Sequence, residues 1–474
     1  MTIEQIYTGC LAQGAYYIQS GAEAAIIDPL REVETYIKKA QASGAKIKYV
    51  FETHFHADFV SGHIDLARKT GATIVYGPNA ETGFDAYIAQ DNEEFKVGEI
   101  TIRVLHTPGH TLESVCYLLI DEQGKETALF SGDTLFIGDV GRPDLAQKAG
   151  ITTQEDLAGM LFDSLRNRIM PLSNDVIVYP AHGAGSACGK NMSKETNDTL
   201  GNQKKFNYAL RDNMTKEEFI TEVTRGLMPP PAYFPLNVKM NREGYENFDS
   251  ILHKGTQPLT PDAFEATANA TGALLLDTRD AQTFASSFIP NAINIGIVGS
   301  FAPWVGALIT DINQPILLIT DDGLEDETVT RLARVGYDNA IGYLKGGVAA
   351  WIAAGKETDS IQSVSAEELA DIKTKHAVNI IDVRKQTEFY AEHVLNAKNL
   401  PLEDINDQLA NLDKTKTYYL HCAGGYRSMI AASILRARGV ENVIDVAGGY
   451  AAIKSTGMKR TDFACPSKAM KIEH

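Results

Sequence analysis

Glu52-Thr-His-Phe-His-Ala-Asp-Phe59 is the most informative stretch of this chain. It directly follows Lys48–Phe51, an apolar run that is typical of a β-strand. His54, His56 and Asp58 are alternate residues, so a loop at the strand end would direct three possible metal ligands towards one point. The stretch therefore predicts a metal site at the end of a strand.

Three later segments share one form, in which a possible ligand lies beside a glycine just beyond an apolar strand. They are Thr107-Pro-Gly-His110, Ser131-Gly-Asp133 and Pro180-Ala-His-Gly183. A glycine at a strand end lets a neighbouring side chain enter a cleft without crowding. His110, Asp133 and His182 therefore join the first group as candidate site residues.

The first half of the chain has α/β character. Runs rich in β-branched and aromatic residues predict strands over 24–28, 48–51, 72–76 and 100–105. Helical periodicity predicts helices over 33–43, 64–70 and 215–225.

The composition excludes several classes of function. The 474 residues include 44 Lys and Arg against 61 Asp and Glu, a formal net charge of −17. No basic excess is available for nucleic acid, no apolar run of about 18 residues predicts a membrane helix, and no signal peptide pattern opens the chain. We expect a cytoplasmic protein that binds neither nucleic acid nor membrane.

The second half contains an internal repeat. Leu274–Arg279, Phe288–Asn294 and Leu344–Trp351 recur, in the same order, at 380–384, 393–399 and 446–453, with offsets of 105, 105 and 102 residues. Such constant spacing indicates two copies of one α/β module. With a change of composition near residue 250, we predict domains at 1–250, 251–359 and 360–474.

The first domain resembles the metallo-β-lactamase superfamily, whose motif is H-x-H-x-D-H followed by single His, Asp and His ligands. The resemblance implies an αββα fold. Phe59 occupies the place of the last motif histidine, which binds a second metal in the binuclear hydrolases of the family. This departure weakens the interpretation as a dizinc thioester hydrolase of the glyoxalase II type.

The persulfide dioxygenases are a branch of this superfamily that uses one metal. Carried over from that branch, the ligands of a single Fe(II), with zinc as the alternative, would be His54, His110 and Asp133. The resemblance leaves His56, Asp58 and His182 to orient ligands or line the substrate cleft. Arg142, in Gly141-Arg-Pro-Asp144, is a candidate for a structural or a substrate-carboxylate contact.

Cys422 lies between a predicted strand, 418–421, and a helix that runs to about residue 438. Loop amides and a helix N-terminus stabilise a thiolate, and Arg427 would add a positive contact. The loop residues that would surround the sulfur are Ala423, Gly424, Gly425 and Tyr426. Together with Asp382-Val-Arg384, His393 and Gly448-Gly449, this loop resembles the C-x4-R active loop of the rhodaneses, or thiosulfate sulfurtransferases.

The first copy of the repeat lacks this chemistry. Its equivalent loop is Ile319-Thr-Asp-Asp-Gly-Leu-Glu-Asp326, without cysteine, and Phe288 stands where the second copy has His393. Acidic residues would repel a persulfide anion. We therefore expect 251–359 to be a rhodanese-like domain without sulfurtransferase activity.

The chain has five cysteines, an odd number without a CxxC pair, which favours free thiols. Cys10 and Cys116 lie in strand-like runs and are expected in the core, and Cys465 lies in a terminal tail. Cys188 follows His182 closely, so we expect it near the metal, either as a persulfide-accepting catalytic thiol or as a plain loop residue.

The resemblances together imply a persulfide dioxygenase fused to two rhodanese-like α/β domains with parallel sheets. Such an enzyme would oxidise a low-molecular-weight thiol persulfide, of the glutathione, bacillithiol or coenzyme A type, with O2 to sulfite or thiosulfate in sulfide detoxification. We expect a homo-oligomer. The alternatives are a dizinc glyoxalase II-like hydrolase with rhodanese domains, and a non-enzymatic sulfane-sulfur carrier.

Overall fold

A computed structural model describes residues 1–147 and 151–463, so the prediction for Cys465 lies outside the described residues. The chain divides into two compact units. Unit 1 comprises Met1–Ser250 and Thr330–Asp338, and unit 2 comprises Ile251–Val329 and Asn339–His474.

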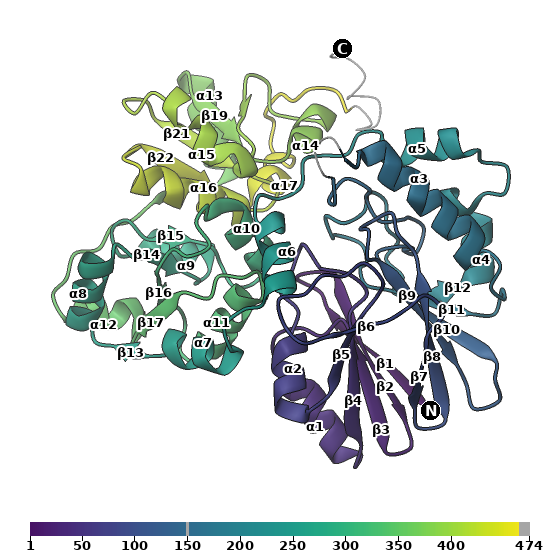
Figure 1. Cartoon of the computed structure of the whole chain (residues 1–474). Helices are drawn as coiled ribbons and strands as arrows, with labels where there is room; N and C mark the ends of the chain where they lie inside the picture. The colour runs from purple at the N-terminus through teal and green to yellow at the C-terminus, as the bar shows by residue number, and fades with distance from the viewer. Residues whose placement is uncertain (148–150, 464–474) are drawn as a thin grey trace. The chain divides into compact units, whose positions relative to one another are not determined.

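Unit 1 contains two six-stranded sheets (Figure 1). The first has the order β1 (Thr2–Thr8), β2 (Gln13–Ser20), β3 (Glu23–Ile27), β4 (Lys46–Phe51), β5 (Thr73–Tyr76) and β6 (Tyr87–Ile88). The second has the order β12 (Asp198–Thr199), β11 (Ile177–Pro180), β10 (Glu126–Gly132), β9 (Val115–Ile120), β8 (Ile100–His106) and β7 (Glu94–Val97).

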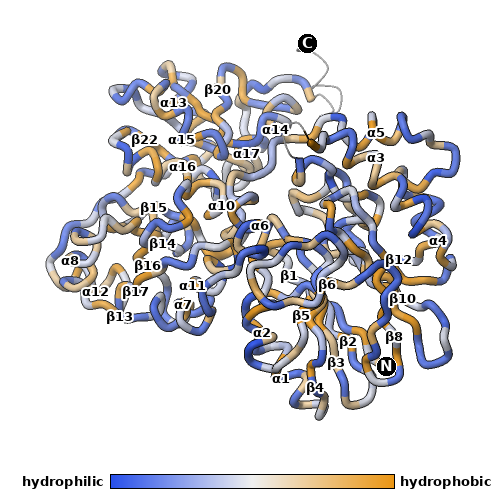
Figure 2. Tube along the Cα trace, in the orientation of Figure 1, coloured by the Kyte–Doolittle hydropathy of each residue, from blue (hydrophilic) through white to orange (hydrophobic). Residues whose placement is uncertain are grey.

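Apolar cores join these sheets to each other and to helices on their outer faces. Side chains such as Phe51 from the first sheet and Tyr117 from the second fill the space between the sheets. A second core packs α1 (Glu34–Ala42) and α2 (His63–Thr70) against the first sheet. A third packs α3 (Gln154–Ser164) and α5 (Lys216–Thr224) against the second. The predicted αββα arrangement is confirmed, and Figure 2 shows hydrophobic residues along the strands of this unit.

The predicted strands of this unit correspond to β3, β4, β5 and β8, and the predicted helices to α1, α2 and α5, with ends that agree within two residues. Cys116 lies buried in β9, as expected. The prediction for Cys10 is wrong: it lies in the turn between β1 and β2, half-buried, because the apolar run around it is interrupted there. Among the described residues, the other α-helices of this unit are α4 (Leu200–Phe206) and α6 (Phe234–Glu243), and α7 (Phe248–Gly255) begins in unit 1 and ends in unit 2.

Strand direction places the candidate ligands at two common sheet edges. β3 and β4 are parallel, so they end at the same edge of the first sheet. In the second sheet β8 and β10 both pair antiparallel with β9, and β10 is parallel to β11. The carboxyl ends of β8, β10 and β11 therefore share an edge, from which the loops with His110, Asp133 and His182 emerge.

Unit 2 contains two five-stranded parallel sheets of the same topology. The first has the order β13 (Pro258–Leu259), β17 (Ala340–Leu344), β16 (Ile316–Ile319), β14 (Leu274–Asp277) and β15 (Ile293–Asn294). The second has the order β18 (Gln362–Val364), β22 (Val443–Val446), β21 (Tyr418–His421), β19 (Asn379–Asp382) and β20 (Lys398–Asn399). Because the two orders match strand by strand, the predicted repeat is confirmed.

Five α-helices accompany each sheet. Those of the first copy are α8 (Pro261–Thr271), α9 (Ala281–Ser286), α10 (Phe301–Leu308), α11 (Glu325–Arg334) and α12 (Gly347–Ala353). Those of the second are α13 (Ala366–Lys375), α14 (Gln386–Ala391), α15 (Ile405–Gln408), α16 (Tyr426–Ala437) and α17 (Gly449–Ile453). Among the described residues, none of the helices has both the length and the apolar character that crossing a bilayer requires.

Candidate functional sites

The ends of three strands bring His54, His110 and Asp133 together. They follow β4, β8 and β10, and all three side chains are buried. Nε2 of His110 lies 3.4 Å, and Nε2 of His54 3.9 Å, from Oδ2 of Asp133. The three ligand atoms lie within 4.8 Å of one another, so the predicted metal ligands form one compact group. We call His54, His110 and Asp133 the metal group.

Hydrogen bonds turn the Nε2 atom of both histidines towards this group. Nδ1 of His110 lies 2.8 Å from the carbonyl oxygen of Arg142, which can only accept, so this nitrogen carries the proton. The hydroxyl of Thr53 donates to Asp28 Oδ2 (2.8 Å), so its oxygen accepts from Nδ1 of His54 at 3.0 Å. Both Nε2 atoms are therefore free to bind a metal, which is the usual arrangement of ligating histidines.

The surroundings of Asp133 indicate a site for a metal ion. Its Oδ1 accepts from Nδ1 of His182 at 2.8 Å, whereas Oδ2 is buried without a hydrogen-bond partner among the described residues. Burial alone would raise the pKa of this carboxyl, but His182, His54 and His110 hold it well below its ordinary value. A buried carboxylate oxygen that faces two imidazole nitrogens suits a divalent ion, and this donor set accepts iron or zinc.

The position before Asp133 requires a glycine, Gly132. Its φ is +51°, in the left-handed region, and a Cβ atom there would lie 2.7 Å from the Thr53 side chain. Another residue would displace Thr53 and, through it, His54.

Replacement of Thr53 by valine tests this orientation of His54. The substitution keeps the shape of the side chain but removes the acceptor for Nδ1, so metal affinity should fall by about 10–100-fold. Competition with a chromophoric chelator measures it. Thr127→Val, which removes a hydroxyl bonded to Leu119 in the same unit, is the control, and equal affinity in both variants would contradict the role given to Thr53.

A second buried group lies beside the first and contains Asp58, His182 and Cys188, with ligand atoms within 4.8 Å of one another. Nε2 of His182 lies 2.9 Å from Asp58 Oδ2. Burial lowers the pKa of His182, but the carboxylates of Asp133 and Asp58 outweigh it and raise the pKa well above its ordinary value. Cys188 thus lies beside the metal group as expected.

The thiol of Cys188 is poorly suited to act as a free nucleophile. Burial, followed by the charges of Asp58 and Asp133, raises the pKa of this thiol well above its ordinary value. A thiol in such surroundings stays protonated at neutral pH, whereas a thiol bound to a metal loses its proton.

His56 belongs to a third buried group of possible ligands, with Asp28 and Glu52, whose ligand atoms lie within 4.8 Å of one another. Its Nε2 lies 3.0 Å from Asp28 Oδ1 and 3.6 Å from Glu52 Oε2, and its ring packs against Phe59 with centroids 4.3 Å apart. Phe59 is itself fully buried. His56 and Phe59 thus pack against each other within the loop that carries His54.

Arg142 has a structural environment. Its guanidinium forms a bidentate pair with Asp144 (2.6 and 2.7 Å) and donates to the carbonyls of Ala187 and Met228. Its backbone N–H donates to the carbonyl of Cys188 at 3.0 Å. Of the two contacts considered for Arg142, the structure favours the structural one.

Cys422 lies on the predicted loop between β21 and α16, and only 1% of it is exposed. Gly425, at a φ of +103°, turns its N–H towards the sulfur, with N 3.1 Å from Sγ. The helix N-terminus that follows adds a positive potential. The cradle, residues 422–426, can therefore hold a sulfur anion.

The side chain of Arg427 is paired with a carboxylate. Its guanidinium forms a bidentate pair with Glu388 at 2.7 and 3.0 Å, so its positive contact to a transferred sulfur stays a prediction. The other motif residues are structural: Arg384 pairs with Asp382 at 2.6 Å, and His393 stacks on Phe389 with centroids 3.7 Å apart.

The first copy of the repeat has the same ion pair and the same ring stack as the second copy, but no cysteine in the equivalent loop. Arg279 pairs with Asp277 at 2.6 Å, and Phe288 stacks on Phe284 with centroids 4.3 Å apart. The equivalent loop between β16 and α11 places Asp321 and Asp322 at the surface. The predicted absence of a sulfur-binding cradle is consistent with this loop.

Sequence reasoning missed the supporting residues of the metal group. Asp28 accepts from both the N–H and the hydroxyl of Thr53, and Glu52 accepts from Ser61 at 2.6 Å. Asp28 directly follows an apolar strand, as the ligands do, but nothing in the sequence pairs it with Thr53.

Comparison with known proteins agrees with the two folds. The profile of the metallo-β-lactamase superfamily matches residues 8–182, and that of the rhodanese-like domain matches 260–354 and 365–456. A probable hydroxyacylglutathione hydrolase of Schizosaccharomyces pombe is 31% identical over 207 residues, which are 39% of this chain and 75% of the relative.

Two solved structures are also similar to this chain. A metallo-β-lactamase from Staphylococcus aureus is 32% identical with a TM-score of 0.63, and the match covers 73% of this chain and 98% of that one. ETHE1 from Myxococcus xanthus is 27% identical with a TM-score of 0.44, over 51% of this chain and 99% of its own. By its profile matches and its 31% identity to the Schizosaccharomyces pombe relative, the chain belongs to the metallo-β-lactamase superfamily and carries two rhodanese-like domains after its metallo-β-lactamase domain.

Proposed function

We propose that this protein is a mononuclear iron persulfide dioxygenase with a C-terminal sulfurtransferase domain. The observation that carries the proposal is the buried group of His54, His110 and Asp133, with two Nε2 atoms and one carboxylate oxygen facing one another. Two imidazoles and one carboxylate with open positions are the ligand set of non-haem Fe(II) oxygenases.

The chain's own residues would hold the ion and shape its surroundings. An Fe(II) ion in this group supplies joint binding of a sulfur ligand and O2. Thr53 and the carbonyl of Arg142 fix the two imidazoles, and His182 holds the second oxygen of Asp133. All these side chains are buried, so protein groups rather than bulk solvent would surround most of the ion.

The proposed reaction is RSSH + O2 + H2O → RSH + sulfite + 2H+. The terminal sulfur loses four electrons, and O2 accepts them, so no further reductant is needed. The substrate RSSH would be a low-molecular-weight thiol persulfide of the glutathione, bacillithiol or coenzyme A type.

Cys422 would carry a sulfane sulfur as Cys-SSH. In one direction it passes this sulfur to sulfite, giving thiosulfate and the free thiol. In the other it passes the sulfur to the thiol RSH, giving RSSH for the oxygenase and the free thiol of Cys422. The cradle N–H of Gly425 and the N-terminus of α16 support either direction, because both stabilise a sulfur anion. Cys188 as a further persulfide acceptor stays a prediction from the sequence, and the raised pKa of its buried thiol counts against that role.

A second candidate function is a binuclear zinc hydrolase. The group of Asp58, His182 and Cys188 favours it, because Cys188 supplies a ligand where Phe59 cannot. The name hydroxyacylglutathione hydrolase, carried by the yeast relative, points to the same class of reaction.

Metal content of the full chain separates the two candidates. We expect about one iron per chain in protein produced with iron and zinc both present, and no change of this ratio in Cys188→Ala. Two zinc ions per chain, reduced to one by Cys188→Ala, would replace the proposal with the hydrolase. A thioester assay with hydroxyacylglutathione gives the matching activity.

A further inference from the structure

We propose that the Cys-less copy of the repeat positions the Cys422 cradle, through Gly296 and Gln282, for sulfur transfer. This inference rests on the sulfurtransferase part of the proposed function. Gly296 and Gln282 are positioning residues, since they act on the sulfur site through Tyr426 and α16. In this way the first copy contributes to a reaction that it cannot carry out itself.

The first link joins Tyr426 to the loop after β15. Tyr426 is the first residue of α16 and the last of the cradle, and its hydroxyl donates to the carbonyl of Gly296 at 2.7 Å. A Cβ atom at Gly296 would lie 3.3 Å from the Tyr426 ring, and one at Gly299 would lie 3.4 Å from it. The loop of the first copy is therefore shaped closely around this ring.

The second link runs from α9 through a buried carboxylate. Gln282 Nε2 donates to Asp445 Oδ2 at 3.1 Å, and Asp445 is fully buried in β22. The hydroxyl of Ser428 lies 2.8 Å from Asp445 Oδ1 and 3.1 Å from the carbonyl of Gly425. Gly425 is the residue whose N–H faces the sulfur of Cys422.

A third contact fixes the same helix farther along. The backbone N–H of Asn294, in β15, donates to Ser433 in α16 at 2.9 Å, and both residues are buried. The first copy thus contacts α16 directly at Tyr426 and at Ser433, and reaches Ser428, in the first turn of the helix, through Asp445. Because the amides of the cradle must point at the sulfur to stabilise its charge, a helix held in this way keeps them aimed.

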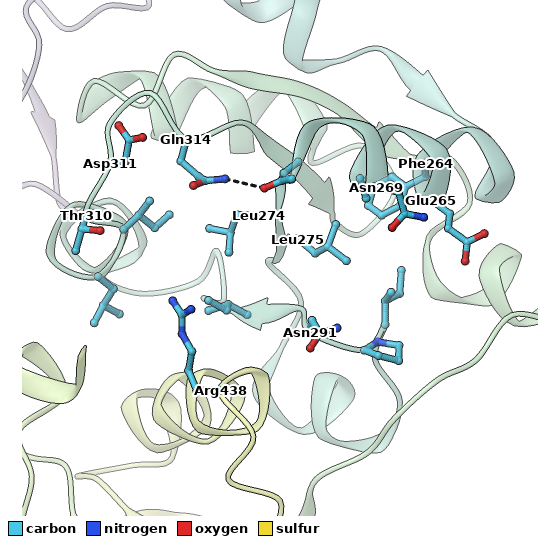
Figure 3. A pocket seen from close by; sticks show the side chains of 18 of the residues that line it. Phe264, Glu265, Asn269, Leu274, Leu275, Asn291, Thr310, Asp311, Gln314 and Arg438 are labelled. Carbon is cyan, nitrogen blue, oxygen red and sulfur yellow. Dashed lines mark hydrogen bonds between the residues drawn. The ribbon is translucent and has the colours of Figure 1, made fainter. Parts of the chain in front are cut away.

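A contact elsewhere between the two copies provides the matched control. Asn406 donates to the carbonyl of Leu308 at 3.1 Å, beside a cavity of about 890 Å³ that Arg438 also lines (Figure 3). None of the cradle residues lines this cavity. Asn406→Ala therefore removes a hydrogen bond between the copies without touching the cradle.

Steady-state sulfur transfer from thiosulfate to cyanide by the full chain tests the inference. In Tyr426→Phe and in Gln282→Ala we expect the KM for thiosulfate to rise about fivefold, because each variant loses one hydrogen bond that holds the cradle in place. Loss of folded protein alone would lower kcat and leave KM unchanged. Asn406→Ala should keep the parent KM.

Hydrogen exchange provides a second readout that does not depend on activity. Peptides that cover residues 422–430 should exchange faster in Tyr426→Phe and Gln282→Ala, and at the parent rate in Asn406→Ala. A parent without sulfur transfer would refute the proposed function. Parent-like KM values and parent-like exchange in both variants would instead overturn the positioning role of the first copy.

Discussion

Replacement of His110 by alanine is expected to abolish persulfide-dependent O2 uptake and to strip the iron from the protein. The side chain supplies one of three ligand atoms, and its Nε2 lies 3.4 Å from Asp133 Oδ2. Loss of a group that only orients a ligand costs about 10–100-fold in affinity, so loss of the ligand itself should exceed about 100-fold. Oxygen-electrode assays and elemental analysis of the purified variant measure both effects.

His106→Ala is the matched control for this variant. His106 lies at the end of the same strand, β8, and its ring contacts the carbonyl of Leu112 rather than the metal group. It should retain the iron and the O2 uptake of the parent. If His110→Ala kept the full iron content, the ligand assignment would be wrong.

Replacement of Cys422 by serine is expected to remove thiosulfate–cyanide sulfur transfer while iron stays bound. A hydroxyl cannot become the persulfide that carries the sulfane sulfur, so the rate should fall by more than about 100-fold. The metal group belongs to unit 1 and Cys422 to unit 2, so the iron content should not change. Cyanide-dependent thiocyanate formation and elemental analysis test the two parts.

Cys10→Ser is the control for the loss of a thiol as such. Cys10 is half-buried in the turn between β1 and β2, and belongs to neither site. Full sulfurtransferase activity in Cys422→Ser would refute the assignment of the second copy, whatever the control shows.

The metal ligands could be predicted because each carries a local signal. His54, His110 and Asp133 all follow an apolar strand, and glycine lies beside two of them. Their supports could not be predicted, because they depend on pairings between distant segments. Asp28 reaches Thr53 only because β3 and β4 lie parallel, and the carbonyl of Arg142 reaches His110 across two loops.

The second ligand group shows the same limit. Phe59 removes one expected ligand, and this loss is visible in the sequence. The short spacing after His182 predicted Cys188 near the metal, but its place beside Asp58 depends on how distant loops pack, which the sequence does not show. Phe59 alone therefore does not exclude a second metal, because Cys188 lies where it could replace the missing ligand.

The repeat was predictable from its constant offsets, and so was the loss of cysteine from its first copy. The contacts between the copies were not. Gly296 and Gln282 carry no motif, and their relation to Cys422 depends on the packing of α16 against β15 and α9.

Oxygen consumption by the iron-loaded full chain, supplied with glutathione persulfide, tests the central claim most directly. Sulfite and thiosulfate are measured in the same samples, with bacillithiol and coenzyme A persulfides as parallel substrates. We expect one O2 to be consumed for each sulfur atom oxidised, with at least one of the three carriers. No O2 uptake with any carrier, together with hydrolysis of hydroxyacylglutathione by the zinc-loaded chain, would contradict the proposed dioxygenase activity.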